Sequence, residues 1–268
     1  MHNKELIELL TKEYTLILAS TPEDFQAVKT VREAVFPLKY NMPSKTLEEK
    51  GFLFSQDDAQ SFLYLLRHIP SNTYVGTVRV FFVNHKTPIR LLPMQKNAGV
   101  KDIGQLTQTL PIVEISRAAL IQNLPYHKKY SIRQLHALLT YRLRIATRIN
   151  FLLYPNTMVF SLMKPALHHI LKRQHVNFKQ IGEPVDSYGM HTPFGIERKA
   201  LLSDTEETMG TITRHYLKAL CQNPDAFWRF IDHNPYLERS DIQLERICQL
   251  FKEYGDDVPL SLLIGEEL

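Results

Sequence analysis

The sequence predicts a mixed α/β domain followed by a helical extension. Segments rich in β-branched and aromatic residues alternate with amphipathic helical segments over residues 1–202, and the pattern becomes wholly helical from Ser203 onward. The chain has 268 residues, of which 44% are apolar and 22% charged, and this composition is ordinary for a soluble globular protein. We therefore expect a sheet domain over residues 1–202 and an extension over 203–268 that packs on it.

Local signals place the elements of the first domain. Runs of β-branched and aromatic residues predict strands over 13–19, 73–83, 112–120, 157–162, 178–182 and 196–202. Apolar periodicity predicts helices over 5–12, 132–150 and 165–174. A further helix is predicted to start at Thr21, whose hydroxyl can cap it, and to end at Pro37. Residues 37–56 are expected to form a mobile loop.

The extension carries helix signals of its own. Ser203 with Glu206, and Ser240 with Gln243, have the spacing of a capping box, and Gly255 is typical of a helix stop. We expect these helices to pack beside the sheet domain and to narrow access to a cavity within it.

Several classes of protein are excluded by composition. No apolar run approaches the roughly 20 residues that a membrane-spanning helix needs. The N-terminus lacks the basic start and apolar core of a signal peptide. Cys221 and Cys248 are too few for a disulfide framework and lack the spacing of a zinc site. We therefore expect a cytoplasmic protein with both thiols reduced.

Charge is distributed unevenly along the chain. Residues 201–268 carry 13 acids and 6 bases, a net charge of −7, so residues 1–200 carry a net charge of +11. Between Glu114 and Glu183 every charged residue is basic. Such a field favours an anionic partner, which can be a phosphate group, a nucleic acid, an acidic protein or a membrane surface. The alternative is that these bases are solvated or paired with acids from elsewhere.

Two segments offer residues with a chemical role. In strand 112–120, alternation places Glu114 and Ser116 on one face and Arg117 on the other. A charge in a central strand needs a partner, so Glu114 either forms a structural ion pair with Arg79 or Arg32, or deprotonates an amine nucleophile. Three basic residues, Lys128, Lys129 and Arg133, surround the start of helix 132–150. Free backbone N–H groups at a helix start favour anions, so these bases can belong to an anion-binding site. The alternative is that they are ordinary solvated side chains.

The order of short motifs along residues 15–200 resembles the N-acyl amino acid synthases and exosortase-associated acyltransferases, which are relatives of the acyl-homoserine-lactone synthases. The motifs are Val31–Phe36, Asp58–Leu65, Val75–Arg79, Leu91–Pro93, Val113–Arg117, Met163–Arg173, Gln180–Glu183, and Gly189 with Pro193. The resemblance implies a GNAT-type fold, with a mixed, mostly antiparallel central sheet flanked by helices. It also implies a bacterial enzyme that moves a fatty acyl chain from acyl carrier protein, or from acyl-CoA, to the amine of an amino acid or similar small molecule.

The same resemblance implies roles for particular residues. It places Arg32, Asp58, Arg79 and Ser116 at the acceptor site, with Glu114 and Arg117 as catalytic residues. Leu138 and Phe160 are expected to line an acyl pocket, as are Phe151 and Leu162. The thioester is expected in the gap between strands 112–120 and 157–162, where a backbone N–H polarises its carbonyl. Lys128, Lys129 and Arg133 are expected to bind the acidic carrier protein.

Departures from the family pattern refine the expectation. Only the last acid of an acidic motif is kept, at Asp58, which argues against lactone synthesis. A glycine-rich pyrophosphate loop is missing at 122–129, which favours a carrier-protein donor over coenzyme A. We expect no tightly bound cofactor, no metal and no nucleic acid, while a peripheral membrane contact fits the basic stretch. The alternatives are an acetyl-CoA-dependent acetyltransferase and a non-enzymatic nucleic-acid-binding protein.

Overall fold

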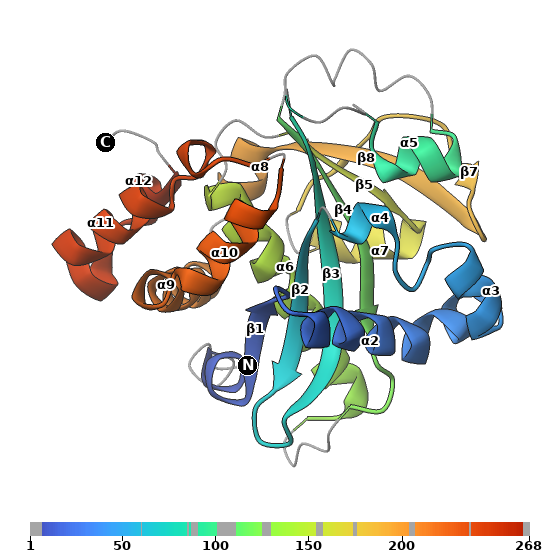
Figure 1. Ribbon diagram of the computed structural model, residues 1–268, viewed down its shortest axis with the longest axis horizontal. Coiled ribbons are helices and arrows are strands. Elements are labelled where there is room, and N and C mark those ends of the chain that lie inside the picture. The colour runs from blue at the N-terminus through green and yellow to red at the C-terminus, as the bar shows by residue number, and fades with distance from the viewer. Residues whose placement is uncertain are drawn as a thin grey trace.

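The computed structural model describes residues 7–59, 61–84, 86, 91–100, 111–124, 130–153, 158–173, 176–203, 207–235 and 237–264. Within them, eight strands form one sheet in the order β1-β2-β3-β4-β5-β8-β6, with β7 paired to β8 (Figure 1). The strands are β1 (Tyr14–Leu18), β2 (Phe62–His68), β3 (Thr73–Val83), β4 (Ile112–Leu120), β5 (Met158–Met163), β6 (Lys179–Gln180), β7 (Val185–Asp186) and β8 (Met190–Glu197). Strands β4 and β5 run parallel and the other described pairings are antiparallel. The predicted mixed, mostly antiparallel sheet is therefore confirmed.

Helices cover both faces of this sheet. They are η1 (Leu9–Glu13), α2 (Pro22–Tyr40), α3 (Ser44–Glu49), α4 (Gln56–Ala59), α5 (Pro93–Ala98), α6 (Ile132–Leu153), α7 (Pro165–Arg173), α8 (Arg198–Ser203), α9 (Glu207–Gln222), α10 (Asp225–His233), η3 (Arg239–Asp241), α11 (Leu244–Tyr254), η4 (Gly255–Asp257) and α12 (Leu260–Ile264). Successive residues of β3 show the division, because side chains alternate along a strand. Phe82 packs in the core that includes Leu139 of α6 and Phe230 of α10, whereas Phe81 packs with Met94 of α5. Helices α6, α9 and α10 thus cover one face, and α2 and α5 lie on the other (Figure 1).

Helix α2 begins as predicted but ends one turn later. The Thr21 hydroxyl accepts a hydrogen bond from the Asp24 N–H, and the Asp24 carboxylate accepts one from the Thr21 N–H. The helix then continues through Pro37 to Tyr40, so the expectation that Pro37 ends it is wrong. A proline this close to the C-terminus removes a single hydrogen bond, and Asn41, at φ 51°, closes the helix with its N–H on the Pro37 carbonyl.

Three other expectations about the first domain are corrected. Residues 37–56 are not a loop, because they include the end of α2 and helix α3, whose Leu47 is fully buried. Strand β2 was not predicted, although its side chains are almost all buried. The strand expected over 196–202 is β8, which lies earlier in the chain and gives way to helix α8 at Arg198.

The C-terminal helices pack against the sheet and share its main core. The ring of Phe62 in β2 lies 4.5 Å from the ring of Phe230 and 6.0 Å from that of Phe227, both in α10. Tyr216 of α9 donates its hydroxyl hydrogen bond to the carbonyl of Tyr14 in β1 at 3.2 Å. Figure 1 shows α9 to α12 gathered on one side of the molecule, beside α6 and η1.

Two expectations about this region are wrong. Cys221 of α9 and Cys248 of α11 are joined by a disulfide, whereas reduced thiols were expected. Ser240 does not cap α11, because it lies in η3 and the helix starts at Leu244 without a side-chain cap. Gly255 does follow the last residue of α11, as predicted. The Ser203–Glu206 capping box lies outside the described residues or side chains.

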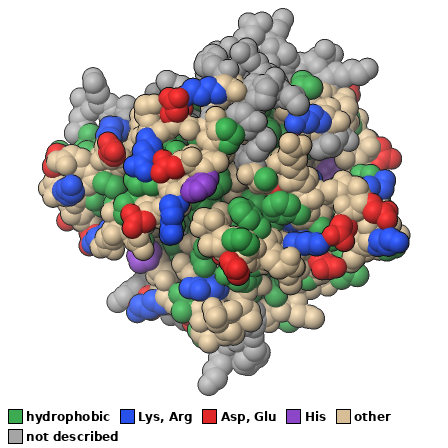
Figure 2. Space-filling view, viewed as in Figure 1, with side chains coloured by type: hydrophobic (Ala, Val, Ile, Leu, Met, Phe, Trp, Pro, Cys, Tyr) green, Lys and Arg blue, Asp and Glu red, His purple; other side chains and the backbone are tan. Residues whose placement is uncertain are grey.

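Charged side chains of both signs are interspersed on the face of the molecule shown in Figure 2. Within the extension, Arg239 pairs with Asp232, and Lys86 of the first domain pairs with Glu238. The acid excess of the extension is therefore mixed with bases on this face and does not form a patch of one sign.

Replacing Tyr216 by phenylalanine should reduce stability by about 0.5–1.5 kcal/mol, because it removes one hydrogen bond between α9 and β1 and leaves the ring in place. A urea unfolding curve measures this as a lower midpoint with an unchanged slope. Tyr254→Phe is the matched control, since Tyr254 is exposed. Equal midpoints for the two variants would show that this contact does not hold the extension to the sheet.

Candidate active site

A bulge in β4 sets the geometry of the site. Thr77 of β3 pairs with Ala119, and Arg79 pairs with Ser116, so one β3 residue faces both Arg117 and Ala118. Arg117 adopts a left-handed conformation, with φ at 54°, which is uncommon for a residue other than glycine. The extra residue breaks the alternation of side chains along the strand. The expectation that Arg117 lies on the face opposite Glu114 is therefore wrong.

Arg117 instead joins a buried cluster of charges around Asp58. One carboxylate oxygen of Asp58, Oδ2, accepts a hydrogen bond from Arg117 Nη1 at 2.6 Å. The other, Oδ1, lies 2.9 Å from Arg32 Nη2 and 3.6 Å from Arg79 Nη1. Burial alone would raise the pKa of Asp58, but the three guanidinium groups lower it below its ordinary range.

Glu114 completes the cluster from β4. Its Oε2 accepts a hydrogen bond from the Met94 N–H at 2.7 Å, and its Oε1 lies 3.6 Å from Arg79 Nη2. Burial raises the pKa of Glu114, although the charge of Arg79 and hydrogen bonds from Met94 and Ser116 oppose the rise. Arg79 Nε also donates to Ser116 Oγ at 3.0 Å. Through its hydrogen bond to the Glu114 carboxylate, Ser116 connects Glu114 to the residues that follow along β4.

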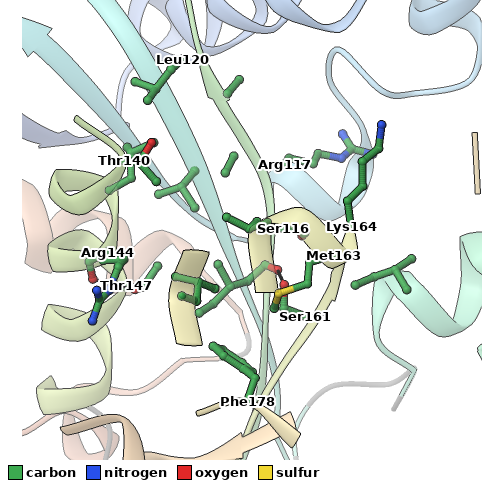
Figure 3. Close-up of a pocket in the computed structure, with 18 of the residues that line it drawn as sticks. Ser116, Arg117, Leu120, Thr140, Arg144, Thr147, Ser161, Met163, Lys164 and Phe178 are labelled. Atoms are coloured by element: carbon green, nitrogen blue, oxygen red, sulfur yellow. Dashed lines mark hydrogen bonds between the residues drawn. The ribbon is translucent and has the colours of Figure 1, made fainter. Parts of the chain in front are cut away.

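A cavity of about 440 Å³ opens where β4 and β5 diverge. The parallel register runs from Ile112–Met158 to Glu114–Phe160, and beyond that pair the Ser161 hydroxyl donates to the Ile115 carbonyl at 3.0 Å. Figure 3 shows Ser116, Ser161 and Met163 facing the cavity, with α6 side chains on one side and Arg117 and Lys164 at the opposite end. The apolar lining includes Val78, Leu120, Leu143, Leu162, Met163, Leu171, Val176 and Phe178.

The cavity is lined by some of the residues predicted for the site. Ser116 and Arg117 line it, whereas Glu114 and Asp58 lie behind them. The acyl-pocket residues Leu138 and Phe160 do not line it, nor does Phe151, while Leu162 does. Phe160 pairs with Glu114 before the strands separate, and Leu138 is not among the α6 residues that line the cavity, which are 136, 140, 143, 144, 147 and 148.

Three residues that sequence reasoning did not select lie at the Arg117 end of the cavity. They are Lys39, Lys164 and His191. The Lys39 ammonium group lies 3.4 Å from the Ala118 carbonyl oxygen, although its side chain as a whole is exposed. The pKa of Lys39 is lowered to about 8, mainly because the surrounding protein displaces water from the ammonium group and secondly because Lys164 is also positively charged. Lys39 was missed because it was assigned to the loop after Pro37, although its spacing of four from Val35, which also lines the cavity, is helical.

One of the three expected carrier-binding residues can be placed relative to this cavity. Arg133 is exposed in the first turn of α6 and does not line it. Lys128 and Lys129 lie outside the described residues. No described residue after Leu201 lines the cavity, and the expectation that the tail narrows access to it stays a prediction.

No protein-family model matches the chain, and no curated protein matches its sequence. Solved structures do match. FeeM, an N-acyl amino acid synthase from uncultured soil microbes, is 13% identical with a TM-score of 0.48, over 72% of this chain and 94% of that one. The AHL synthase LasI is 10% identical with a TM-score of 0.39, over 70% and 94% of the two chains. A GNAT-family acetyltransferase from Streptococcus agalactiae is 11% identical with a TM-score of 0.39, over 69% and 95%.

The strand order itself, with β4 and β5 as a parallel pair that diverges within a mostly antiparallel sheet, confirms the predicted mixed α/β architecture. The described residues contain no group of three or more His, Cys, Asp or Glu side chains able to hold a metal ion. In the same part of the chain, none of the helices has the length and apolar character needed to cross a bilayer.

Proposed function

We propose that the protein is an N-acyltransferase that moves a fatty acyl group from a thioester donor to the amine of a small molecule with an acid group, such as an amino acid. One observation carries the proposal: a single cavity has apolar walls and a cationic end. Its volume of about 440 Å³ is within the range of small-molecule sites. The apolar lining extends well beyond what an acetyl group would fill, which favours a longer acyl chain.

The cationic end supports an acceptor that carries an anion. In the buried cluster three guanidinium groups face two carboxylates, which leaves an excess of one positive charge. Arg117 is the member of the cluster that lines the cavity, and its side chain is 12% exposed. Lys39 and Lys164 add two further cations at the same end. A carboxylate bound there would neutralise this excess and form charge-assisted hydrogen bonds.

The divergence of β4 and β5 supports direct transfer without a covalent enzyme intermediate. Beyond Glu114 the β4 backbone is no longer paired with β5, so its N–H groups can polarise a thioester carbonyl in the gap. The acceptor nitrogen attacks this carbonyl carbon, a C–N bond forms and the C–S bond breaks. Glu114 takes a proton from the attacking nitrogen through the Ser116 hydroxyl and returns it to the departing thiolate.

The donor side of the proposal rests on the start of α6. Arg133 is exposed there, next to Lys128 and Lys129 in the sequence. We propose that these bases steer an acidic acyl carrier protein, because complementary charge raises the rate of encounter. Acyl-CoA is the other donor to be tested.

The test is an assay of products. The protein is incubated with decanoyl-acyl carrier protein or decanoyl-CoA, together with either a pool of amino acids or a pool of the corresponding decarboxylated amines. Mass spectrometry is expected to detect N-decanoyl amino acids, and far less product from the amines. Equal yields from both pools would show that the acceptor's carboxylate is not recognised, while the acyltransferase activity would stand. No N-decanoyl product from either pool with either donor would overturn the proposed function.

Replacing both Lys39 and Lys164 by glutamine should raise the KM for the amino acid about 10-fold, which corresponds to about 1.4 kcal/mol of binding. The kcat should change less than the KM, because the lysines bind the acceptor's carboxylate and take no part in forming the C–N bond. Steady-state kinetics measures both constants. Lys172→Gln is the matched control, since Lys172 is exposed on α7 and does not line the cavity. A double variant with an unchanged KM would show that the carboxylate binds elsewhere.

A further inference from the structure

His191 of β8 lines the cationic end of the cavity in a fixed tautomer. Its Nδ1 lies 2.6 Å from the carbonyl oxygen of Gly189. A carbonyl oxygen can only accept a hydrogen bond, so Nδ1 carries the hydrogen. The neutral ring then has its lone pair at Nε2. Gly189 is held in place by its own N–H, which donates to Asp186 Oδ1 at 3.0 Å, and its φ of 102° suits glycine.

The groups around His191 favour the neutral ring. Burial is the main cause that lowers its pKa below the ordinary value of 6.5, and the charges of Lys164, after β5, and Lys39, in α2, lower it further. The Gly189 carbonyl and Asp186 of β7 act in the opposite direction with a smaller effect. At neutral pH the ring is therefore unprotonated and able to accept a proton.

The proposed reaction requires two proton transfers from the acceptor nitrogen. An aliphatic amine in neutral water is an ammonium ion, which has no lone pair and cannot attack a carbonyl. One proton must leave before attack and a second must leave as the amide forms. The balance is ammonium plus thioester giving amide, thiol and one released proton. Glu114 and Ser116 serve the second transfer, whose proton ends on the thiol, so the first transfer needs another acceptor.

We propose that His191 accepts, at Nε2, the proton that the acceptor's ammonium group loses before its nitrogen attacks the thioester. This inference rests on the proposed function. The cations that would hold the acceptor's carboxylate, Lys39, Arg117 and Lys164, also disfavour a further positive charge beside them. They therefore lower the pKa of the bound ammonium as well as that of His191, which favours passage of the proton through His191 to solvent. The imidazolium then releases its proton to solvent, for which its low pKa suits it.

His191→Asn gives a direct test, because the asparagine amide can keep the hydrogen bond to the Gly189 carbonyl while Nε2 is lost. Two acceptor probes of nearly equal shape are compared, each with decanoyl-CoA: β-alanine, whose nitrogen is an ammonium at neutral pH, and aminooxyacetate, whose nitrogen is already neutral. The variant should lose about 10²-fold in kcat/KM with β-alanine and change little with aminooxyacetate. His169→Gln, on the exposed surface of α7, is the control and should leave both rates unchanged.

The pH dependence provides a second measurement. With β-alanine, kcat/KM of the parent enzyme should fall as the pH drops through the pKa of His191, below 6.5, because the protonated ring cannot accept a proton. In His191→Asn that limb should disappear, and the rate should recover at high pH, where the free amine forms without help. Nitrogen NMR of the folded protein should also show His191 as the Nδ1–H tautomer at neutral pH.

Each other outcome is decisive. Equal losses with both probes would mean that His191 shapes the cavity and does not move the proton, which overturns the inference. Unchanged rates with both probes overturn it as well. If His191→Asn does not fold, His191→Ala with added imidazole replaces it, and a failure of imidazole to restore the rate with β-alanine counts against the inference. A parent enzyme that acylates neither these probes nor any amino acid, with decanoyl-CoA or with decanoyl-acyl carrier protein, overturns the proposed function itself.

Discussion

Replacing Asp58 by asparagine is expected to reduce the free energy of unfolding by about 3–5 kcal/mol, because it removes the charge that three buried guanidinium groups share. The asparagine side chain would fill the same volume and accept one hydrogen bond. It would leave Arg32 and Arg117 without a carboxylate and Arg79 with Glu114 alone. A loss of this size is a large part of the stability of an ordinary domain, so much of the variant should be insoluble or unfold at a low temperature.

Asp57→Asn is the matched control for this change. Asp57 is the adjacent residue, and its ion pair with Lys96 is partly exposed, so its removal should cost no more than about 1 kcal/mol. Thermal unfolding followed by circular dichroism separates the two variants. A similar small shift for both would mean that the arginines are solvated, and that the buried cluster does not stabilise the fold.

The same cluster predicts how stability depends on acid. The folded-state pKa of Asp58 lies below its ordinary value of 3.8, so its contribution is fully present above that pH. The contribution is lost as the pH falls through the folded-state pKa. Acid unfolding of the parent protein should therefore occur below about pH 4, and the acid sensitivity below that pH should be weaker in Asp58→Asn.

The sequence predicted the parts of the fold whose signals are local. Strand 112–120 has the predicted bounds because its β-branched residues lie between Pro111 and a polar turn. The start of α2 at Thr21 was predicted because a capping hydroxyl is followed directly by Pro22, a residue typical of the first turn. The end of that helix was not, because one lost hydrogen bond at Pro37 is offset by the turn that follows, a balance that propensity does not show.

The residues of the candidate site were also predicted only in part. The order of motifs grouped the members of the charged cluster, and the structure brings them together; they are Arg32, Asp58, Arg79, Glu114 and Arg117. The bulge that turns Arg117 toward Asp58 depends on pairing with β3, some 40 residues away, and no local pattern marks it. His191 and Lys164 meet Lys39 only because β8 pairs with β5 and α2 crosses the end of the gap. Such residues are found by tertiary contact and not by spacing.

Glu114→Gln is expected to lower kcat by about 10²–10⁴-fold while the protein stays folded. Glutamine keeps the shape of the side chain and the oxygen that accepts from the Met94 N–H, but it cannot take a proton from the acceptor nitrogen through Ser116. Arg79 keeps Asp58 as a partner, so the loss of stability should be smaller than in Asp58→Asn. Pre-steady-state kinetics with decanoyl-CoA and an amino acid measures the chemical step, and thermal unfolding measures the fold.

Ser116→Ala tests the same proton path from its cavity end. If Ser116 carries the proton, this variant should slow the chemical step nearly as much as Glu114→Gln, and the double variant should be little slower than either, because residues that act as one unit are not additive. Losses that multiply in the double variant would show two independent roles. A Glu114→Gln enzyme with normal turnover at neutral pH would make Glu114 a structural partner of Arg79. A variant that fails to fold would support the same ion-pair role, because Arg79 would then need the carboxylates of both Asp58 and Glu114.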